Sequence, residues 1–526
     1  PWLLTMAGEG AVGSVMAIDL WRTAAVCSVA ILSVLLWCAQ ATAQGGDHSW
    51  SRPIDLFVVN TDEEGVWSPA IVADSGGALY AFWIYFYQDA GQAIYYARRD
   101  SSGWSNPNDI MFSPDQGSVV ELSVALDSRG YLHLAWLGRS TFSQAYKIYY
   151  TRAHVLRADS IGGWLTPVVM AVVPDYVVPR ASPILTTDRP GNVHMLFWDY
   201  LSGAYSLYYI KSVDGGNTWS RPVRVSGFDP NEFMRPCALA VGGDGRFHLA
   251  WARYPLYSPS LDIMSANYYP GLWYSQSEDG GSSWGLPVEI AGVGRSGHGF
   301  GELNVAALDN DEVHLVWNGS GDVNGRYHQW SNDGGRSWTK PTRILGIGGQ
   351  AGIPALVVDS DGVLHVITAG SDQPPVHLWW ESERWSRPES FDVGGYHELP
   401  AATITEGNNL HVIGLGYRAG QADEGFRRVW YVSRRLSSRY VPPQPVPTPL
   451  PTATATSTPP VTPALTPSPK PAIGGSQAKP AISSSERITV LSNISVWYPL
   501  AAGILPAALI LAAVAFTRAF KPRSSR

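Results

Sequence analysis

Arginine, carboxylate and aromatic side chains recur at the ends of short apolar segments in the middle of the chain. One set precedes such segments: Trp67, Glu121, Arg180, Arg235, Glu302, Gln350, His397 and Glu398. A second set follows them: Tyr85, Tyr87, Arg139, Asp199, Arg253, Tyr254, Asn318 and Arg418. A guanidinium binds a carboxylate through two hydrogen bonds, and two carboxyl groups at a suitable distance can cleave a glycosidic bond. These residue types indicate a site that binds a sugar or acts on one.

A repeated unit positions these residues. Each copy has a first strand led by Pro, an Asp-containing turn, a second strand ending near Trp, a third strand with paired aromatics, and then W-S-x-P. The second strands are LYAFW (79–83), LHLAW (132–136), VHMLFW (193–198), FHLAW (247–251), VHLVW (313–317), LHVIT (364–368) and LHVIG (410–414). The apolar pattern between turn signals predicts short strands. Seven copies therefore predict seven four-stranded units.

The last copy lacks a fourth strand of its own. Six copies continue into W-x-x-P, whereas an isolated WSRPIDLFVV stands at 50–59, before the first copy. We expect this segment to complete the seventh unit and close a ring. The predicted fold is an all-β, seven-bladed β-propeller, and six blades with one aberrant unit is the alternative. In a propeller, the loops that carry the two residue sets converge on one mouth, where we expect the site.

Three turns between third and fourth strands share the pattern S-x-D-G-G-x-[ST]-W. They read SVDGGNTW (212–219), SEDGGSSW (277–284) and SNDGGRSW (331–338). This pattern resembles the Asp-box, or bacterial neuraminidase repeat (BNR), of sialidase-like propellers. Asp214, Asp279 and Asp333 are expected to accept turn N–H groups, and Trp219, Trp284 and Trp338 to pack between blades. The box turns lie on the face opposite the mouth, so we predict a structural role for them.

The resemblance also implies a site. Sialidases bind the substrate carboxylate with three arginines and use a Tyr–Glu pair as the nucleophile and an Asp as acid or base. The residues that could correspond are Arg180, Arg235, Glu302, Glu121 and Asp199, with Arg253 or Arg418 as the third arginine. The Arg-Ile-Pro signature of sialidases is missing, and the nearest fragments are Val178-Pro179-Arg180 and Met234-Arg235-Pro236. This departure favours a binding role over sialidase activity.

Further mouth residues are candidate ligand contacts. They are Arg253, Arg418, Tyr254, Tyr257, Asn318, Trp67 and His397. Tyr254 and Tyr257 belong to the longest loop, 252–271, and either stack on sugar rings, contact a protein, or pack on their own blade. One His recurs at the same position of the second strand in six units, which predicts a structural role and no metal site. We identify no cofactor motif.

The ends of the chain indicate an extracellular location. Residues 1–43 contain the charged, apolar and small-residue regions of a secretory signal, although an uncleaved N-terminal anchor is the alternative. Residues 44–440 form the predicted ectodomain, and 441–493 a disordered stalk rich in Pro and Thr. Residues 494–517 have the length and hydropathy of a transmembrane helix, and the basic tail 518–526 predicts a cytoplasmic C-terminus. Cys237 is then the one cysteine of the mature chain.

Composition limits the possible partners. The formal charge is −7 and charged residues make up 15% of the chain, so no basic surface for nucleic acid is expected. The leading hypothesis is a surface-anchored propeller that recognises an extracellular glycan or protein. The alternatives are an exo-glycosidase of sialidase type and a purely architectural role in the cell envelope.

Overall fold

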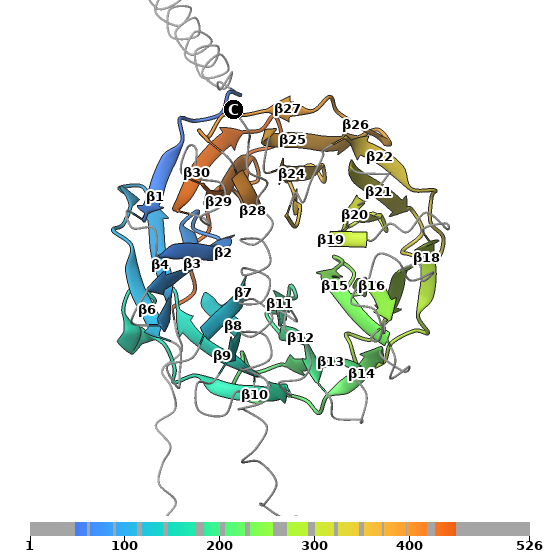
Figure 1. Cartoon of the computed structure of the whole chain (residues 1–526), viewed down its shortest axis with the longest axis horizontal. Helices are drawn as coiled ribbons and strands as arrows, with labels where there is room; N and C mark the ends of the chain where they lie inside the picture. Colours follow the sequence, from blue (N-terminus) through green and yellow to red (C-terminus); the bar gives the residue numbers. More distant parts are fainter. Residues whose placement is uncertain are drawn as a thin grey trace, which may run out of the picture. The chain divides into compact units, whose positions relative to one another are not determined.

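The computed structural model describes residues 48–448, apart from a set of loop segments. The segments left out are 60–63, 88–90, 113–117, 140–145, 174–182, 200–205, 227–231, 256–270, 293–299, 320–324, 347–351, 371–372, 396 and 418–426. The described strands form seven antiparallel sheets arranged in a ring, and we call the region along the axis of this ring the channel (Figure 1). This arrangement confirms the predicted seven-bladed propeller. The predicted signal, transmembrane helix and tail lie outside the described residues.

Every blade has four strand positions, numbered outward from the channel. Blade 1 has β2 (Gly65–Ala73), β3 (Leu79–Tyr87), β4 (Gly91–Asp100) and an outer position shared by β5 (Gly103–Trp104) and β6 (Asn108–Phe112). Blade 2 has β7 (Ser118–Leu126), β8 (Tyr131–Arg139), β9 (Tyr146–His154) and β10 (Val168–Val173), with the 3-10 helix η2 (Ile161–Gly163) before β10. Blade 3 has β11 (Ile184–Thr187), β12 (Val193–Asp199), β13 (Ser206–Ser212) and β14 (Val223–Ser226). Blade 4 has β15 (Glu232–Val241), β16 (Phe247–Pro255), β17 (Gly271–Ser277) and β18 (Val288–Gly292).

The remaining blades repeat this order up to the ring closure. Blade 5 has β19 (Phe300–Ala307), β20 (Val313–Gly319), β21 (Gly325–Ser331) and β22 (Thr342–Leu345). Blade 6 has β23 (Ala355–Val358), β24 (Leu364–Gly370), β25 (Gln373–Glu381) and an outer position shared by β26 (Arg384–Trp385) and β27 (Glu389–Ser390). Blade 7 has β28 (His397–Thr405), β29 (Asn409–Gly416) and β30 (Arg428–Arg435). The main outer strands begin directly after the Pro of W-x-x-P, because Pro has no N–H to donate to a ladder.

The N-terminal strand closes the ring as predicted. β1 (Ile54–Val58) pairs antiparallel with β30 and supplies the outer strand of blade 7. Just before it, the Trp50 ring stacks on Phe391 of blade 6 with centroids 4.0 Å apart. The first and last strands of the ring therefore belong to one sheet, and closure joins residues more than 370 positions apart in the sequence.

The Asp-boxes are compact turns held by their own side chains. In blade 4, Asp279 accepts hydrogen bonds from the hydroxyl of Ser277 at 2.9 Å and from the backbone N–H of Ser283 at 2.8 Å. The Ser283 hydroxyl donates to the second Asp279 oxygen at 2.6 Å. Asp214 and Asp333 make the same contacts in blades 3 and 5. Each of these aspartates therefore accepts hydrogen bonds from the turn that contains it.

Each complete box also covers the seam to the preceding blade. The Trp284 ring packs edge-on against Tyr209 of blade 3 at 5.5 Å, and Gly281 lies against the same tyrosine. A Cβ on Gly281 would come within 2.0 Å of the Tyr209 ring, so only glycine fits. The other two box tryptophans make the corresponding contacts: Trp219 with Tyr150, and Trp338 with Tyr274. These tryptophans therefore pack between blades, as expected.

The recurring histidines are structural. Four of them contact the hydroxyl of a third-strand tyrosine in the same blade through Nδ1 at 2.7–2.8 Å: His133, His194, His248 and His411. In blades 5 and 6 the partners are His328 and His377. Burial lowers the pKa of His248 to about 4, so this imidazole is neutral near pH 7. Among the described residues, no group of three or more His, Cys, Asp or Glu is arranged to hold a metal ion.

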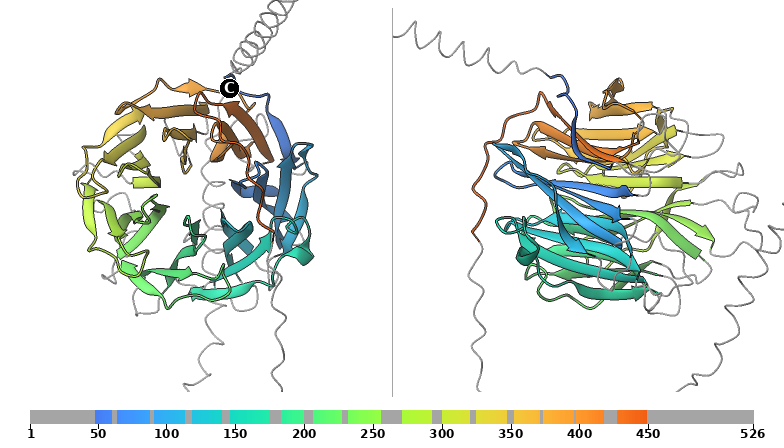
Figure 2. Two further views of the ribbon diagram at one scale, coloured as in Figure 1. Left: turned by 180° about the vertical axis from the view of Figure 1, so that it is seen from behind. Right: turned by 60° about the vertical axis from the view of Figure 1, so that its left-hand side comes forward.

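The chain after β30 crosses the face that carries the Asp-boxes. The N–H of Val441 donates to Glu406 of blade 7 at 2.7 Å, and that of Gln444 donates to Ser75 of blade 1 at 2.6 Å. The Pro447 carbonyl then lies 3.0 Å from His154 of blade 2. The view from behind in Figure 2 shows this orange segment passing over the blades. We call residues 436–448 the strap. In the described part of the chain, no helix has the length and hydropathy needed to cross a membrane.

Candidate functional site at the mouth of the channel

Irregular pairing marks the mouth end of the innermost strands. The register between the first and second strands shifts in β2, β7, β15, β19 and β28, in each case near the start of the first strand. A bulge of this kind bends the strand and redirects a side chain. It therefore places a residue from each of these strands at the channel.

Two predicted carboxylates occupy the same position in different blades. Glu121 stands five residues before the end of β7, and Glu302 stands five residues before the end of β19. Blades 2 and 5 lie on opposite sides of the channel, as the labels β7 and β19 show in Figure 1. Both carboxylates are half-buried. They therefore belong to opposite walls at an equivalent depth.

Glu302 has a left-handed backbone, with φ 38°. Ser68 and Leu399, in the corresponding bulges of β2 and β28, also have positive φ, at 50° and 51°. Because three different residue types share this conformation, the bulge imposes it, and the cost of such a backbone is borne by the surrounding sheet. The fold thus fixes where the Glu302 side chain starts.

Blade 5 carries a buried polar pair where the other blades are apolar. Asn318 of β20 lies opposite Arg326 of β21, and the two residues are 5% and 0% exposed. At the same register position the other blades have these pairs: Ile84 with Ile94, Leu137 with Ile148, Trp198 with Leu207, Ala252 with Leu272, and Leu415 with Val429. Burying a guanidinium costs free energy unless it is paired, so this exception requires partners.

Arg326 has partners in its own and in the next blade. Its Nε donates to the Thr368 hydroxyl of β24 at 2.8 Å, and its terminal nitrogen donates to the Gly352 carbonyl. Burial lowers the pKa of Arg326 to about 10, while the negative charge of Glu302 opposes that shift. Arg326 therefore remains charged near pH 7 beside a carboxylate. We call Glu302, Asn318, Arg326 and Thr368 the blade-5 polar cluster.

Blade 1 contributes an aromatic wall. The Tyr85 hydroxyl donates to Glu64 at 2.5 Å, and the hydroxyls of Tyr87 and Tyr95 lie 2.6 Å apart. The Tyr85 and Tyr87 rings meet edge-on at 4.4 Å, and Phe57 of β1 packs behind Tyr85 and Tyr95. Burial, followed by the Glu64 carboxylate, raises the pKa of Tyr85. These tyrosines are therefore neutral, with apolar faces and polar tips.

The remaining predicted site residues divide into two groups. Trp67 is 45% exposed near the aromatic wall, and Asp199 is buried at the end of β12, opposite Ser206. The Ser206 hydroxyl accepts from Nε of Arg224 at 3.0 Å. For Arg235, Arg253, Tyr254 and His397 the structure describes the backbone alone, and Arg180, Tyr257 and Arg418 lie outside the described residues.

Arg326, Thr368 and the tyrosines of blade 1 other than Tyr85 and Tyr87 were not candidates from the sequence. Arg326 lies inside a predicted third strand, whereas the site residues predicted from the sequence lie at the ends of first and second strands. Aligning the third strands would have shown it, because RYHQW is the one copy that has an arginine at a position held by Ile, Leu or Val in five others. Thr368 has no comparable signal, since its role depends on the neighbouring blade.

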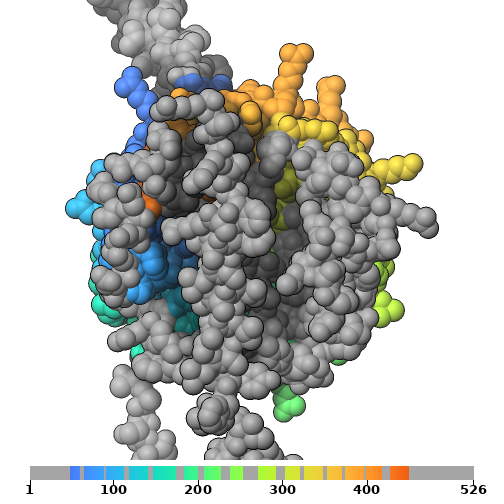
Figure 3. Space-filling view, viewed as in Figure 1, coloured from blue at the N-terminus to red at the C-terminus, as the bar shows by residue number. Residues whose placement is uncertain are grey.

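In Figure 3, the blue to teal atoms of blades 1 and 2 and the yellow to orange atoms of blades 5 and 6 lie on different sides of the ring. The blade-5 polar cluster and the aromatic wall of blade 1 belong to these two sides. The arrangement offers a half-buried carboxylate and a buried guanidinium on one side and amphipathic rings on the other. Such a combination suits a ligand with both hydroxyl groups and apolar faces, as a sugar has.

Comparison with known proteins gives a family and a fold. The profile of the BNR repeat-like domain matches residues 132–412, more than half of the chain. A search of the curated proteins found no match. Among solved structures, the polysaccharide lyase Uly1 is 12% identical over 74% of this chain and 99% of that chain, with a TM-score of 0.51.

Two further solved structures show a weaker likeness. An α-L-arabinanase from Penicillium chrysogenum, solved with arabinobiose, is 13% identical over 73% of this chain and 98% of that chain, with a TM-score of 0.44. A Hadza microbial sialidase is 13% identical over 73% of this chain and 68% of that chain, with a TM-score of 0.41. At these identities the likeness concerns the fold alone.

Proposed function

The chain belongs to the BNR repeat-like family of sialidase-like propellers, and from this premise we propose that it binds glycans at the mouth of its channel. The observation that carries the proposal is the blade-5 polar cluster. Five other blades are apolar at the position of Arg326, so the fold itself does not require a buried guanidinium there. A charge placed at such a cost beside Glu302 indicates a functional site.

The cluster suits the recognition of sugar hydroxyls. Arg326 supplies a positive charge whose field favours the ionised form of Glu302, and an ionised carboxylate accepts hydrogen bonds from sugar hydroxyls. The aromatic wall of blade 1, with the exposed Trp67, supports the proposal because aromatic rings stack on the apolar faces of sugars. The polysaccharide lyase that shares this fold acts, by its name, on a related class of ligand.

A second candidate function is glycoside hydrolysis of sialidase type. It is favoured by Glu121 and Glu302, which hold equivalent positions on opposite walls of the channel. Glycosidases use two carboxyl groups on either side of the scissile bond. In this alternative one of the two acts as acid, and the other as nucleophile or base.

One experiment tests both functions. The full-length protein is applied to a glycan array and to a panel of fluorogenic glycosides that includes sialosides. We expect saturable glycan binding that falls at least tenfold in Glu302→Gln and Arg235→Ala, and is unchanged in the control Glu381→Gln, an exposed residue of β25. Turnover lost in Glu302→Gln and Glu121→Gln would establish the enzyme. Binding only to a protein, or equal glycan binding by all variants, would contradict the proposal.

We further propose that the site faces the extracellular space. The predicted signal (1–43), stalk (441–493), transmembrane helix (494–517) and basic tail (518–526) support a single-pass surface protein. The strap supports it as well, because it lies on the Asp-box face, opposite the mouth, and therefore leaves the mouth open to large ligands. Protease treatment of intact cells should release the propeller.

A further inference from the structure

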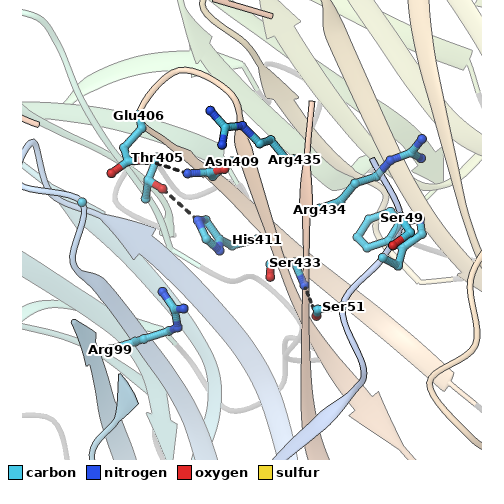
Figure 4. A pocket seen from close by; sticks show the side chains of 12 residues that line it. Ser49, Ser51, Arg99, Thr405, Glu406, Asn409, His411, Ser433, Arg434 and Arg435 are labelled. Atoms are coloured by element: carbon cyan, nitrogen blue, oxygen red, sulfur yellow. Dashed lines mark hydrogen bonds between the residues drawn. The ribbon is translucent and has the colours of Figure 1, made fainter. Parts of the chain in front are cut away.

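A cavity lies on the Asp-box face, opposite the mouth, at the seam between blades 7 and 1. Its volume is about 440 Å³. Its walls come from the segment before β1, from blade 1 and from β28–β30 of blade 7: Ser49, Trp50, Ser51, Gly77, Arg99, Thr405, Glu406, Asn409, His411, Ser433, Arg434 and Arg435 (Figure 4). Because the N-terminal segment supplies part of the wall, the cavity exists only in the closed ring.

The cavity is open because the turn of blade 1 is short. The length of this turn is counted from the third-strand residue that pairs with the first residue of the second strand to the tryptophan of the turn. In the box of blade 4 this segment has eight residues, Ser277 to Trp284. The corresponding turn of blade 1 has six, Arg99 to Trp104, and lacks the paired glycines. Trp104 still packs against Tyr431 of blade 7 at 5.0 Å, but the rest of the box is absent.

Blade 6 shows how a short turn is otherwise filled. Its turn also has six residues, and Trp380 occupies the position of Arg99. The Trp380 ring packs against His328 and Trp330 of blade 5 at 4.8 and 5.3 Å. In blade 1, Arg99 replaces this ring and lies 5.9 Å above Tyr431. The short turn is therefore packed by the Trp380 indole at the seam of blades 5 and 6, whereas at the seam of blades 7 and 1 the Arg99 guanidinium lies beside a cavity.

The charges in the cavity do not balance. Arg434 forms an ion pair with Glu389 and lies over the Trp50 ring, and Figure 4 shows it turned away from Arg99 and His411. Arg99 and Arg435 have no carboxylate at ion-pair distance among the described residues. Glu406 is the one acidic residue of the wall, and it accepts from the Asn409 side chain at 2.7 Å. The wall therefore contains two guanidinium groups outside ion-pair distance of any described carboxylate, and a single carboxylate, Glu406.

Hydroxyl and amide groups complete the wall. Thr405 and His411 lie 2.8 Å apart, and the N–H of Ser433 donates to Ser51 at 2.9 Å. Guanidinium groups bind carboxylate and sulfate oxygens through paired hydrogen bonds, whereas hydroxyl and amide groups suit the rest of a polar ligand. The volume lies in the range of small-molecule sites and accommodates a monosaccharide.

We propose that this cavity binds a small anion whose carboxylate or sulfate group lies between Arg99 and Arg435. The carrier of the anion is either a sugar acid or free inorganic sulfate. This site is separate from the mouth, so the proposal stands independently of the function proposed above.

The test is titration calorimetry of the full-length protein at low salt with sodium glucuronate, with sodium sulfate and with uncharged glucose. We expect saturable binding of glucuronate or sulfate, and none of glucose. Binding should weaken at least tenfold in Arg99→Gln and in Arg435→Gln. The control Arg387→Gln, an exposed arginine after β26, should bind like the wild type. Tighter binding of glucuronate than of sulfate would identify a sugar acid, and binding of sulfate alone an inorganic anion.

A filling variant separates loss of the site from loss of the fold. Arg99→Trp reproduces the residue of blade 6 and should abolish binding without lowering the melting temperature, because Trp380 already fits this geometry. Near-UV circular dichroism of each variant checks folding. If Arg99→Gln unfolds, Arg435→Gln still tests the site, because Arg435 is exposed and its replacement should not affect folding. Equal affinity in wild type and both glutamine variants, or no saturable binding of either anion, would overturn the proposal.

Discussion

Arg326 shows how one residue can depart from its repeat. Replacing it by Met keeps the side-chain length but removes the charge, leaving the Thr368 hydroxyl and the Gly352 carbonyl without their partner. A buried acceptor left without its hydrogen-bond partner costs about 1–3 kcal/mol. We expect Arg326→Met to lower the free energy of unfolding by about 3 kcal/mol in urea denaturation. The exposed Arg343→Met is the control, and a loss below about 0.5 kcal/mol in Arg326→Met would contradict a structural need for the charge.

The box aspartates give the fold a defined dependence on pH. Hydrogen bonds from Ser283 lower the pKa of Asp279 to about 2, below its ordinary value of 3.8. A depressed folded pKa means that the stabilisation is complete above about pH 4 and is lost as the pH falls through 2. Asp279→Ala should cost about 1–2 kcal/mol at pH 7, and the difference from wild type should shrink between pH 4 and pH 2.

Urea denaturation at pH 7, 5 and 3 measures this effect. The matched control is Glu278→Ala, whose side chain is 63% exposed and reaches Arg336 at 3.8 Å, an ion pair that contributes little. A cost for Asp279→Ala that is independent of pH would show that the turn does not depend on the ionised carboxylate.

The site residues illustrate what a single sequence reveals at this scale. Glu121 and Glu302 were predicted, because each directly precedes an apolar strand at the mouth. Arg326 was missed because it lies within a strand, and its importance depends on burial by the next blade. The sequence predicted Asp199 at the mouth, but it did not predict that Asp199 is buried opposite Ser206.

At the scale of elements, period and turn chemistry predicted almost all of the fold. The second strands, the W-x-x-P outer strands and the N-terminal closing strand lie where the repeat placed them. The bulges near the mouth could not be predicted, because their surroundings include the neighbouring blade: the Leu122 N–H of blade 2, for example, donates to the Ser68 hydroxyl of blade 1 at 3.0 Å. Those bulges fix the site, which is why the fold was easier to predict than the site.

Ring closure depends on a short segment, and Trp50 anchors it. Its ring is held between Phe391 and the guanidinium of Arg434. Trp50→Ala should lower the free energy of unfolding by about 2–3 kcal/mol and make the N-terminal segment susceptible to limited proteolysis. Ile54→Ala, in the strand β1 that follows Trp50, is the control. It should cost less than about 1 kcal/mol, because the Ile54 side chain is already 47% exposed to water. Equal effects of both variants would mean that Trp50 is not the anchor.

At the scale of the whole molecule, the strap extends the folded unit beyond the last strand. The sequence prediction ends the ectodomain at residue 440, and residues 441–448 make further hydrogen bonds to blades 7, 1 and 2. The composition of 441–448 resembles that of the stalk that follows, so nothing in it signals docking. Its hydrogen bonds to Ser75 and His154 depend on surfaces formed by blades 1 and 2.

Two truncated chains test whether the strap belongs to the fold. A chain ending at 440 loses the hydrogen bonds of Val441 and Gln444 and the packing of Val446 against the core of blades 1 and 2, whereas a chain ending at 448 keeps them. We expect the shorter chain to be less stable by about 2 kcal/mol in urea denaturation, because three hydrogen bonds, including that between His154 and Pro447, and one apolar contact are removed. The point variant Val446→Asp, in the chain ending at 448, should reproduce about half of that loss, since it removes the apolar contact alone. Equal stability of the two truncated chains would show that the ring ends at residue 440.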